Sequence, residues 1–223
     1  MKKSLKSQFL VALLMVVAIG ACLNQSAASA ATQNRHYDVK VDGKPAGSYT
    51  LAIASNGDST DVVSDCTVHH KILVFNYDYK YHGHETYKDN QLNTFSCTCN
   101  DSGKHFNIAM KRSPDNGLSY SVNGKNGTTS GDTILSSYWL YPGNETNKDG
   151  FKFFEVDSGR TFRAKFKPLG NDNLTISGHP TTCRHVELVG GDDGELWYAD
   201  NRMVRQSSSN LGHKTVIELT RID

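Results

Sequence analysis

The stretch FNYDYKYH, residues 75–82, alternates aromatic and polar side chains. A period of two is typical of a β-strand, in which successive side chains point to opposite faces of the sheet. The aromatic members would therefore share one face of the strand: Phe75, Tyr77, Tyr79 and Tyr81. This row predicts a β-sheet with one face lined by aromatic rings.

Short extended segments and turn signals continue the pattern on both sides of the row. Asn56-Gly57, Asp89-Asn90 and Asn123-Gly124 are turn pairs of the kind that join antiparallel strands. The pattern predicts an all-β fold, a curved antiparallel sheet or open β-barrel with at most one or two short helices. A short helix is expected over Asp132–Tyr141, where apolar residues gather. No internal linker stands out, so residues 31–223 are expected to form a single domain.

Residues 1–30 have the composition of a secretory signal peptide. A basic start precedes an apolar run, Phe9–Ala21, that is too short to span a bilayer core of about 30 Å as a helix. Cleavage after Ala28-Ser29-Ala30 would release a soluble chain. Alternatively, Ile19-Gly20-Ala21-Cys22 resembles a lipobox, and an acylated Cys22 would anchor the same domain to a membrane. We expect an exported protein in the periplasm, with lipid anchoring as the alternative and no other membrane contact.

The distribution of charge excludes one class of partner. The whole chain has 24 Lys and Arg against 23 Asp and Glu, and its first thirty residues contain three lysines and no acid. Beyond that leader the chain is slightly acidic, with 21 basic and 23 acidic residues. No basic stripe remains to follow a phosphate backbone, so nucleic acid is not an expected partner.

Several short motifs follow one another along nearly the whole chain after the leader. They are Tyr37-Asp38-Val39, Asp42-Gly43-Lys44-Pro45-Ala46-Gly47, Tyr79-Lys80-Tyr81-His82, Glu85-Thr86-Tyr87, Asn100-Asp101-Ser102-Gly103, Tyr138-Trp139, Val156-Asp157-Ser158-Gly159, Pro168-Leu169-Gly170 and Leu196-Trp197-Tyr198-Ala199-Asp200. In order and spacing, this series resembles an uncharacterised family of exported bacterial proteins, domain of unknown function 6134. The family usually has Trp where this chain has Tyr87. The resemblance implies an exported, β-rich domain and, because the family is uncharacterised, no activity.

The segment Leu196-Trp197-Tyr198, followed by Met203-Val204-Arg205, is also similar to the tail of the periplasmic lipoprotein carriers. In those proteins a curved, half-open antiparallel sheet shelters acyl chains. This second resemblance implies a ligand-holding role.

The aromatic row allows two interpretations. Such a row most often belongs to a packed core. Alternatively, it lines a cavity in which tyrosine hydroxyls orient a mostly apolar guest, with tryptophans as plugs or rims. The candidate ligand site then consists of six aromatic residues: Phe75, Tyr77, Tyr79, Tyr81, Trp139 and Trp197. Its expected partner is an apolar or lipid-like small molecule, without a cofactor.

Histidines and cysteines form a second candidate site. His82 and His84 lie two apart, as do Cys97 and Cys99, so each pair occupies one face of a strand. If Asp89-Asn90 is a two-residue turn, His82 lies opposite Cys97 and all four side chains share a face. Such a set would suit zinc or copper as cofactor. A three-residue turn would separate the pairs, and histidines on the outer surface are the simpler interpretation.

Four cysteines follow the leader: Cys66, Cys97, Cys99 and Cys183. An even number in an oxidising compartment favours disulfides. Cys97 and Cys99 cannot pair within one strand, because side chains two apart are separated by about 6.5 Å. Disulfides that link them to the other two cysteines are therefore expected, with the metal site and free thiols as alternatives.

Signals for catalysis are weak. The chain has no Gly-x-Ser-x-Gly nucleophile elbow, and Asp78 and Glu85 lie in a strand where an exposed carboxylate is expected. We therefore predict a non-enzymatic protein that binds an apolar or amphipathic ligand in the concavity of its sheet. A periplasmic metal-binding protein and an envelope interaction module without ligand are the alternatives.

Overall fold

The computed structural model describes residues 31–72, 75–143, 149–191, 194–210 and 212–223, so the predicted leader and Cys22 lie outside the described residues. The described residues form strands and no helix. The strands are β1 (Ala31–Val41), β2 (Lys44–Asn56), β3 (Ser59–Ile72), β4 (Phe75–Lys88), β5 (Gln91–Asp101), β6 (Lys104–Arg112), β7 (Leu118–Val122), β8 (Lys125–Thr129), β9 (Ile134–Leu135), β10 (Phe151–Phe154), β11 (Thr161–Ile176), β12 (His179–Val189), β13 (Gly194–Ala199), β14 (Arg202–Asn210) and β15 (His213–Ile222). Nothing in this part of the chain has the helical length and apolarity that a membrane crossing requires.

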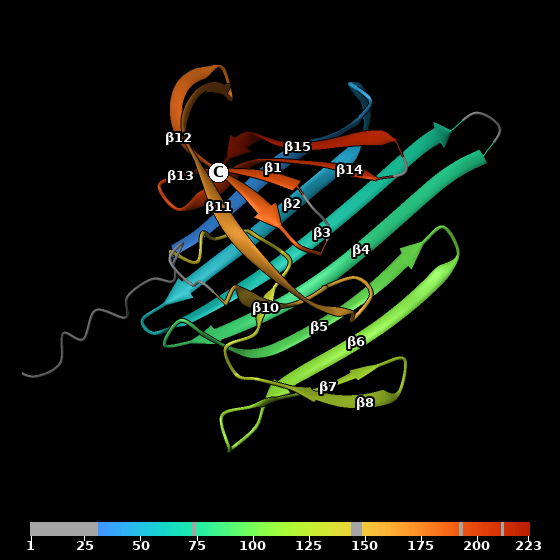
Figure 1. The fold of residues 1–223 in the computed structure, drawn as a ribbon, viewed down its shortest axis with the longest axis vertical. Coiled ribbons are helices and arrows are strands. Elements are labelled where there is room, and N and C mark those ends of the chain that lie inside the picture. The colour runs from blue at the N-terminus through green and yellow to red at the C-terminus, as the bar shows by residue number, and fades with distance from the viewer. Residues whose placement is uncertain (1–30, 73–74, 144–148, 192–193, 211) are drawn as a thin grey trace, which may run out of the picture.

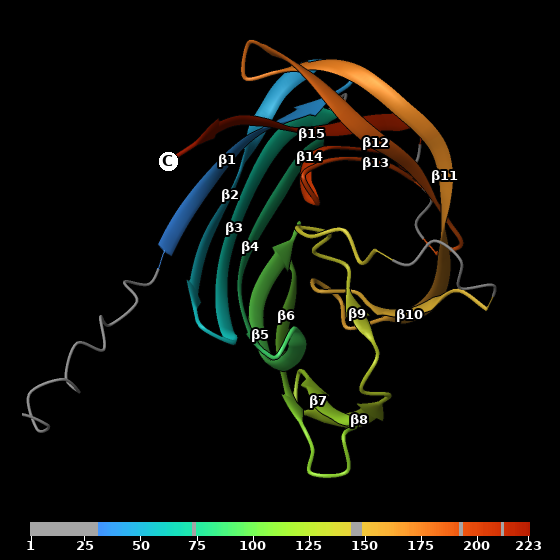
Figure 2. The ribbon, with the colours of Figure 1, turned by 90° about the vertical axis from the view of Figure 1, so that its left-hand side faces the viewer.

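One sheet contains all the strands, in the order β8-β7-β6-β5-β4-β3-β2-β1-β15-β14-β13-β12-β11-β10-β9. Most neighbours are consecutive in sequence and antiparallel; β9 runs parallel to β10, and β1 pairs with β15. The sheet curls until its two arms face each other across a concave side (Figure 1, Figure 2). Its end strands, β8 and β9, do not pair, so no barrel closes. The prediction of an all-β fold with a curved, open antiparallel sheet is confirmed.

Tight turns with positive φ connect the strands. Asp89 and Asn90 have φ values of 51° and 61°, and Asp200 and Asn201 have values of 49° and 61°. Positive φ at both central residues is the type I′ geometry, which matches the right-handed twist of antiparallel strands. Asp and Asn adopt this conformation more readily than other non-glycine residues. These turns keep consecutive strands adjacent and so build the sheet as a meander.

Inward-facing side chains form two apolar clusters. The larger cluster joins β1 and β2 to the C-terminal strands, with Tyr37 and Leu196 among its buried members. The smaller one joins β4–β7 to β9 and β10, where the Phe154 ring lies 6.4 Å from Phe95 and 5.0 Å from Tyr120 between ring centroids. Edge-to-face aromatic pairs of this kind each contribute roughly 0.5–1.5 kcal/mol beyond burial. Side-chain packing between the two arms thus stabilises the curl, although their edges do not pair.

Residues 130–143, called the crossing segment below, pass along the concave side between β8 and β10 (Figure 2). The helix predicted over Asp132–Tyr141 is wrong, because this segment consists of the two-residue strand β9 with turns on both sides. Its backbone bonds to distant parts of the sheet: Tyr141 N donates to Asn201 O at 2.9 Å, and Ser136 N donates to Phe154 O at 3.0 Å. Partners contributed by the tertiary structure outweigh the weak local preference for helix.

Candidate functional site

Strand β4 carries the aromatic row, and its two faces have different environments. Tyr81 is 6% exposed and Glu85 is completely buried, whereas Asp78 and His82 are exposed. Odd-numbered side chains of β4 therefore point to the concave side of the sheet, and even-numbered ones point outward. Phe75 belongs to β4, but its side chain lies outside the described residues.

The concave side contains a half-open cavity of about 350 Å³. Tyr77, Tyr79 and Tyr81 line it from β4, and apolar side chains of the opposite arm face them. The other lining residues are Val39, Val41, Tyr49, Cys66, Val68, Ser136, Ser137, Tyr138, Glu155, Val156, Asp157, Phe162, Leu188, Gly194, Glu195, Leu196, Gln206, Ser208, Asn210, Thr215 and Ile217. This volume is at the lower end of the range for small-molecule sites, about 300–1,000 Å³. The structure thus places three members of the predicted aromatic row in the wall of one cavity.

Asp157 is the best-defined polar group of the cavity. It lies in the turn after β10, and the Tyr79 hydroxyl donates to its Oδ2 at 3.0 Å. Burial raises the pKa of Asp157, and the neighbouring Glu155 acts in the same direction. The preceding residue, Val156, accepts a hydrogen bond from Cys97 Sγ at 2.8 Å, which ties this turn to β5. Sequence reasoning missed Asp157, because only the tertiary structure brings that turn to the tyrosine row.

Tyr81 lies over Gly83 on the concave side of β4. A Cβ atom at Gly83 would be 2.1 Å from the Tyr81 hydroxyl, so this position requires glycine for the ring to lie there. The hydroxyl is buried beside Ser64, and burial raises the pKa of Tyr81. Tyr81 therefore presents its ring, and not its hydroxyl, to the cavity.

Trp139, a predicted ligand-binding residue, does not line this cavity; with Tyr87 it lines a separate hollow of about 430 Å³. Its Nε1 donates to Glu85 Oε2 at 3.1 Å, and the Tyr87 hydroxyl donates to the same oxygen at 2.6 Å. Arg35 Nη1 donates to the Trp139 carbonyl at 3.0 Å and holds the crossing segment against β1. Burial raises the pKa of Glu85. The expectation that Glu85 is exposed is wrong; its odd number, shared with the inward tyrosines of β4, was the signal for burial.

Trp197 also lies away from the cavity. Its neighbour Leu196 lines the cavity, so the indole points to the other side of β13. There its ring stacks on His185 with centroids 4.2 Å apart, and its Nε1 donates to Asp172 Oδ2 at 2.9 Å. The structure therefore does not unite the six candidate aromatic residues in one site.

The predicted metal site is not assembled. The two-residue turn forms as expected, with Lys88 opposite Gln91, but a bulge between Thr86 and Tyr87 shifts the register of β4 and β5 by one residue. A one-residue shift moves every later side chain to the other face. The zinc or copper site from His82, His84, Cys97 and Cys99 is therefore wrong: the histidines face outward and the cysteines face inward.

The outward histidines pair with carboxylates of β3. His82 Nδ1 lies 2.7 Å from Asp65 Oδ1, and His84 Nε2 lies 3.1 Å from Asp61 Oδ1. Across the described residues, no three His, Cys, Asp or Glu side chains are grouped so that they could hold a metal ion.

All four cysteines of the described chain are free, so the predicted disulfides are not formed. Cys66 and Cys99 flank Tyr81 from the two neighbours of β4. Two strand spacings separate their Cα atoms by roughly 10 Å, beyond the roughly 7 Å that a disulfide tolerates. Burial raises the pKa of Cys66 and of Cys97 to about 12. Such thiols are weak nucleophiles at neutral pH.

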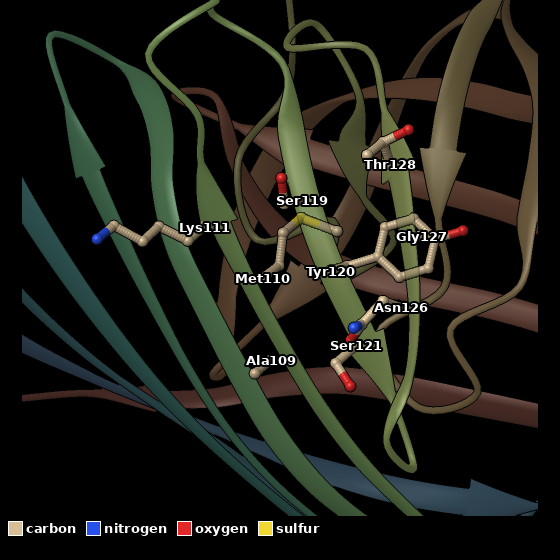
Figure 3. Close-up of a pocket in the computed structure, with 9 residues that line it drawn as sticks. All are labelled: Ala109, Met110, Lys111, Ser119, Tyr120, Ser121, Asn126, Gly127 and Thr128. Carbon is tan, nitrogen blue, oxygen red and sulfur yellow. The ribbon is translucent and has the colours of Figure 1, made fainter.

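A second hollow, of about 670 Å³, lies over β6–β8 (Figure 3). This part of the surface is depressed because it carries small side chains, among them Ala109, Ser119 and Ser121. On the other face of these strands the Tyr120 ring covers Gly127, where a Cβ atom would approach it to 2.5 Å. A surface hollow with small polar side chains offers a guest little apolar contact. The cavity that contains three members of the predicted aromatic row is therefore the candidate site.

Comparison with known sequences assigns a family and no activity. The family model described as Domain of unknown function (DUF6134) matches residues 37–220. No curated protein matches the chain. Every residue that lines the cavity lies within the matched range.

Proposed function

The chain belongs to the DUF6134 family, which supplies no activity, and we propose that it is a non-enzymatic, exported protein that binds an apolar or amphipathic ligand in its concave cavity. One observation carries the proposal. Tyr77, Tyr79 and Tyr81 line a half-open cavity of about 350 Å³ whose opposite wall includes Leu196 and Ile217. Apolar walls with a few placed polar groups are the usual composition of a small-molecule site.

The size and chemistry of the cavity limit the ligand. A volume near the lower end for small-molecule sites favours one compact molecule or a single short alkyl chain. Aliphatic walls favour an apolar body, and the Tyr79–Asp157 pair offers a place for a polar end. An amphipathic molecule with one polar end satisfies both requirements.

The chemistry of the buried groups supports binding over catalysis. The thiols nearest the cavity have raised pKa values, which keep them protonated at neutral pH. The buried carboxyl of Glu85 accepts two hydrogen bonds from Tyr87 and Trp139, which hold it in the packed part of the concavity. These groups fit structural roles.

Ligand occupancy tests the proposal directly. The full chain would be expressed with its own leader, purified without detergent, and measured by native mass spectrometry and by analysis of its organic extract. We expect a small apolar or amphipathic molecule in about molar equivalence with the protein. A protein that carries no such molecule and binds none from a panel of alkyl compounds would refute the proposal.

Two neighbouring residues of β15 provide a matched pair of variants. Ile217 lines the cavity, whereas Val216 lies next to it in the strand and points to the other face. Ile217→Trp should fill the cavity and abolish ligand binding, and Val216→Trp should bind as the unmodified protein does. Circular dichroism and urea unfolding verify that both variants fold. Equal ligand binding by two folded variants would place the ligand elsewhere and contradict the proposal.

Export is tested by the intact mass of the same product. We expect a chain that begins after Ala30 or one that carries acyl groups on Cys22. A product that keeps all thirty leader residues would contradict export and leave the binding proposal to its own test.

A further inference from the structure

The charged groups that line the cavity all have one sign. Glu155, Asp157 and Glu195 are among the lining residues, and none of the described lining residues is Lys, Arg or His. The remaining polar groups are hydroxyls, amides and the Cys66 thiol. The cavity therefore offers a guest several acceptors and no cation.

Two of the three carboxylates already have a basic neighbour. Arg160 Nη2 lies 2.9 Å from Glu155 Oε1, and His185 Nε2 lies 3.6 Å from Glu195 Oε2. Asp157 has no such neighbour in the described part of the chain, where its side-chain partner is the neutral hydroxyl of Tyr79. Burial raises the pKa of Asp157 first, and Glu155 and Asp101 add to this effect. Asp157 is thus a half-buried carboxyl without a basic neighbour in the described part of the chain.

Asp157 is the charged acceptor that a guest in the cavity can reach. Its side chain lines the cavity and is half-buried, and its Oδ2 accepts one hydrogen bond from the Tyr79 hydroxyl. A carboxylate has two oxygens and can accept several hydrogen bonds, so Asp157 keeps acceptor capacity beyond Tyr79. Asp157 therefore points to a polar end of the ligand inside this cavity.

We infer that this polar end is a hydrogen-bond donor without negative charge, an amine or a hydroxyl that binds at Asp157. This inference rests on the proposed function and names its ligand class. An ammonium group would form a charge-assisted hydrogen bond with Asp157 and supply the missing counter-ion. A carboxylate or phosphate would meet like charge in a desolvated site, which disfavours its binding. The cavity therefore selects against fatty acids and phospholipid head groups.

Three probes with the same alkyl chain test the selectivity: decylamine, decanol and decanoate. Each is titrated calorimetrically into the full chain at neutral pH, below its own aggregation concentration. Decylamine should bind at least about tenfold more tightly than decanoate, since a charge-assisted hydrogen bond contributes enough for one decade in affinity. Asp157→Asn should weaken decylamine by about tenfold and change decanol little, because the amide keeps an acceptor but loses the charge. Asp65→Asn, a change on the outer face, is the matched control and should leave all three affinities unchanged.

The possible outcomes separate this inference from the proposed function. If decanoate binds most tightly, or if folded Asp157→Asn keeps full affinity for decylamine, the inference is wrong and the binding function stands. If none of the three probes binds and the protein carries no ligand, the proposed function itself fails. Urea unfolding of each variant shows whether a lost affinity reflects lost folding.

Discussion

A hydrogen bond from a tyrosine to a carboxyl group occurs at both ends of the concave face of β4, but the surroundings of the two carboxyl groups differ. At one end Tyr87 donates to Glu85 at 2.6 Å, and at the other Tyr79 donates to Asp157 at 3.0 Å. Trp139 packs against Tyr87 and donates to Glu85 at the first end, which we call the filled end because Glu85 is completely buried there. The second end borders the cavity. A curved sheet therefore does not make a binding site by itself. The crossing segment contributes to both ends, with Trp139 over Glu85 and with Ser136, Ser137 and Tyr138 in the wall of the cavity.

Removal of the Trp139 ring should give the largest effect, because it empties the filled end. Trp139→Ala deletes a buried aromatic side chain and its hydrogen bond to Glu85, so we expect the free energy of unfolding to fall by about 3–5 kcal/mol. Urea denaturation measures the change. Leu140→Ala, at an adjacent position that is 46% exposed, should cost less than about 0.5 kcal/mol. Similar losses for both variants would show that Trp139 does not support the filled end.

The carboxyl groups of Glu85 and Asp157 should contribute differently to the pH dependence of the free energy of unfolding. Burial raises both pKa values above the ordinary 4.5 for Glu85 and 3.8 for Asp157. Between the ordinary and the raised pKa, the folded protein holds a proton that the unfolded chain has released. Each group therefore stabilises the fold most below its ordinary pKa, and this contribution falls as pH rises toward the folded-state pKa. The slope is at most about 1.4 kcal/mol per pH unit for one proton.

Urea unfolding in steps from about pH 4 to pH 8 measures these slopes as differences between each variant and the unmodified protein. Glu85→Gln should reduce the pH dependence of the free energy of unfolding more than Asp157→Asn does, because Glu85 is completely buried and Asp157 borders the cavity. The opposite order would mean that Asp157 is the more desolvated carboxyl, and it would reverse the assignment of filled and open ends.

A substitution on the outer face of the sheet, where Asp65 of β3 pairs with His82 of β4, should change the free energy of unfolding least. It serves as the reference for the substitutions on the concave face. Asp65→Asn removes the partner of His82, and both side chains are more than half exposed. Exposed ion pairs contribute roughly 0.2–1 kcal/mol, so a change of that size or less is expected in denaturant titrations at low salt. A larger loss would mean that the His–Asp pairs of the convex face stabilise the sheet as much as its interior does.

Local sequence patterns predicted the architecture well, because strands and turns depend on neighbouring residues. The alternation around Tyr79 identified an inward face, and Asp89-Asn90 identified a tight turn that the structure contains. The bulge beside Thr86 was not predictable, since it depends on how two strands fit together over their whole length. At this bulge β5 has one residue more than β4. The extra residue turns Cys97 and Cys99 to the concave face, away from the histidines, and so rules out the predicted metal site.

The candidate site was predicted only in part for the same reason. Tyr77, Tyr79 and Tyr81 follow from periodicity, and the structure brings them to the cavity. Asp157 comes from a turn far along the chain, and no local pattern connects it to Tyr79. The crossing segment was assigned as helix because its apolar residues cluster, whereas its backbone partners are supplied by distant strands.

The pairing of β1 with β15 has a consequence for how the molecule reaches this structure. His36 and Asp223, which are 187 residues apart, lie 3.0 Å from each other, so the centre of the sheet is completed by β15, which follows every other described strand in the sequence. Contacts of such high sequence separation slow folding, because a long loop must close before they form. Until β15 arrives, β1 presents an edge of unpaired amides and carbonyls to other chains. This topology therefore exposes the chain to aggregation during biogenesis, and a chaperone that covers the edge of β1 would prevent it.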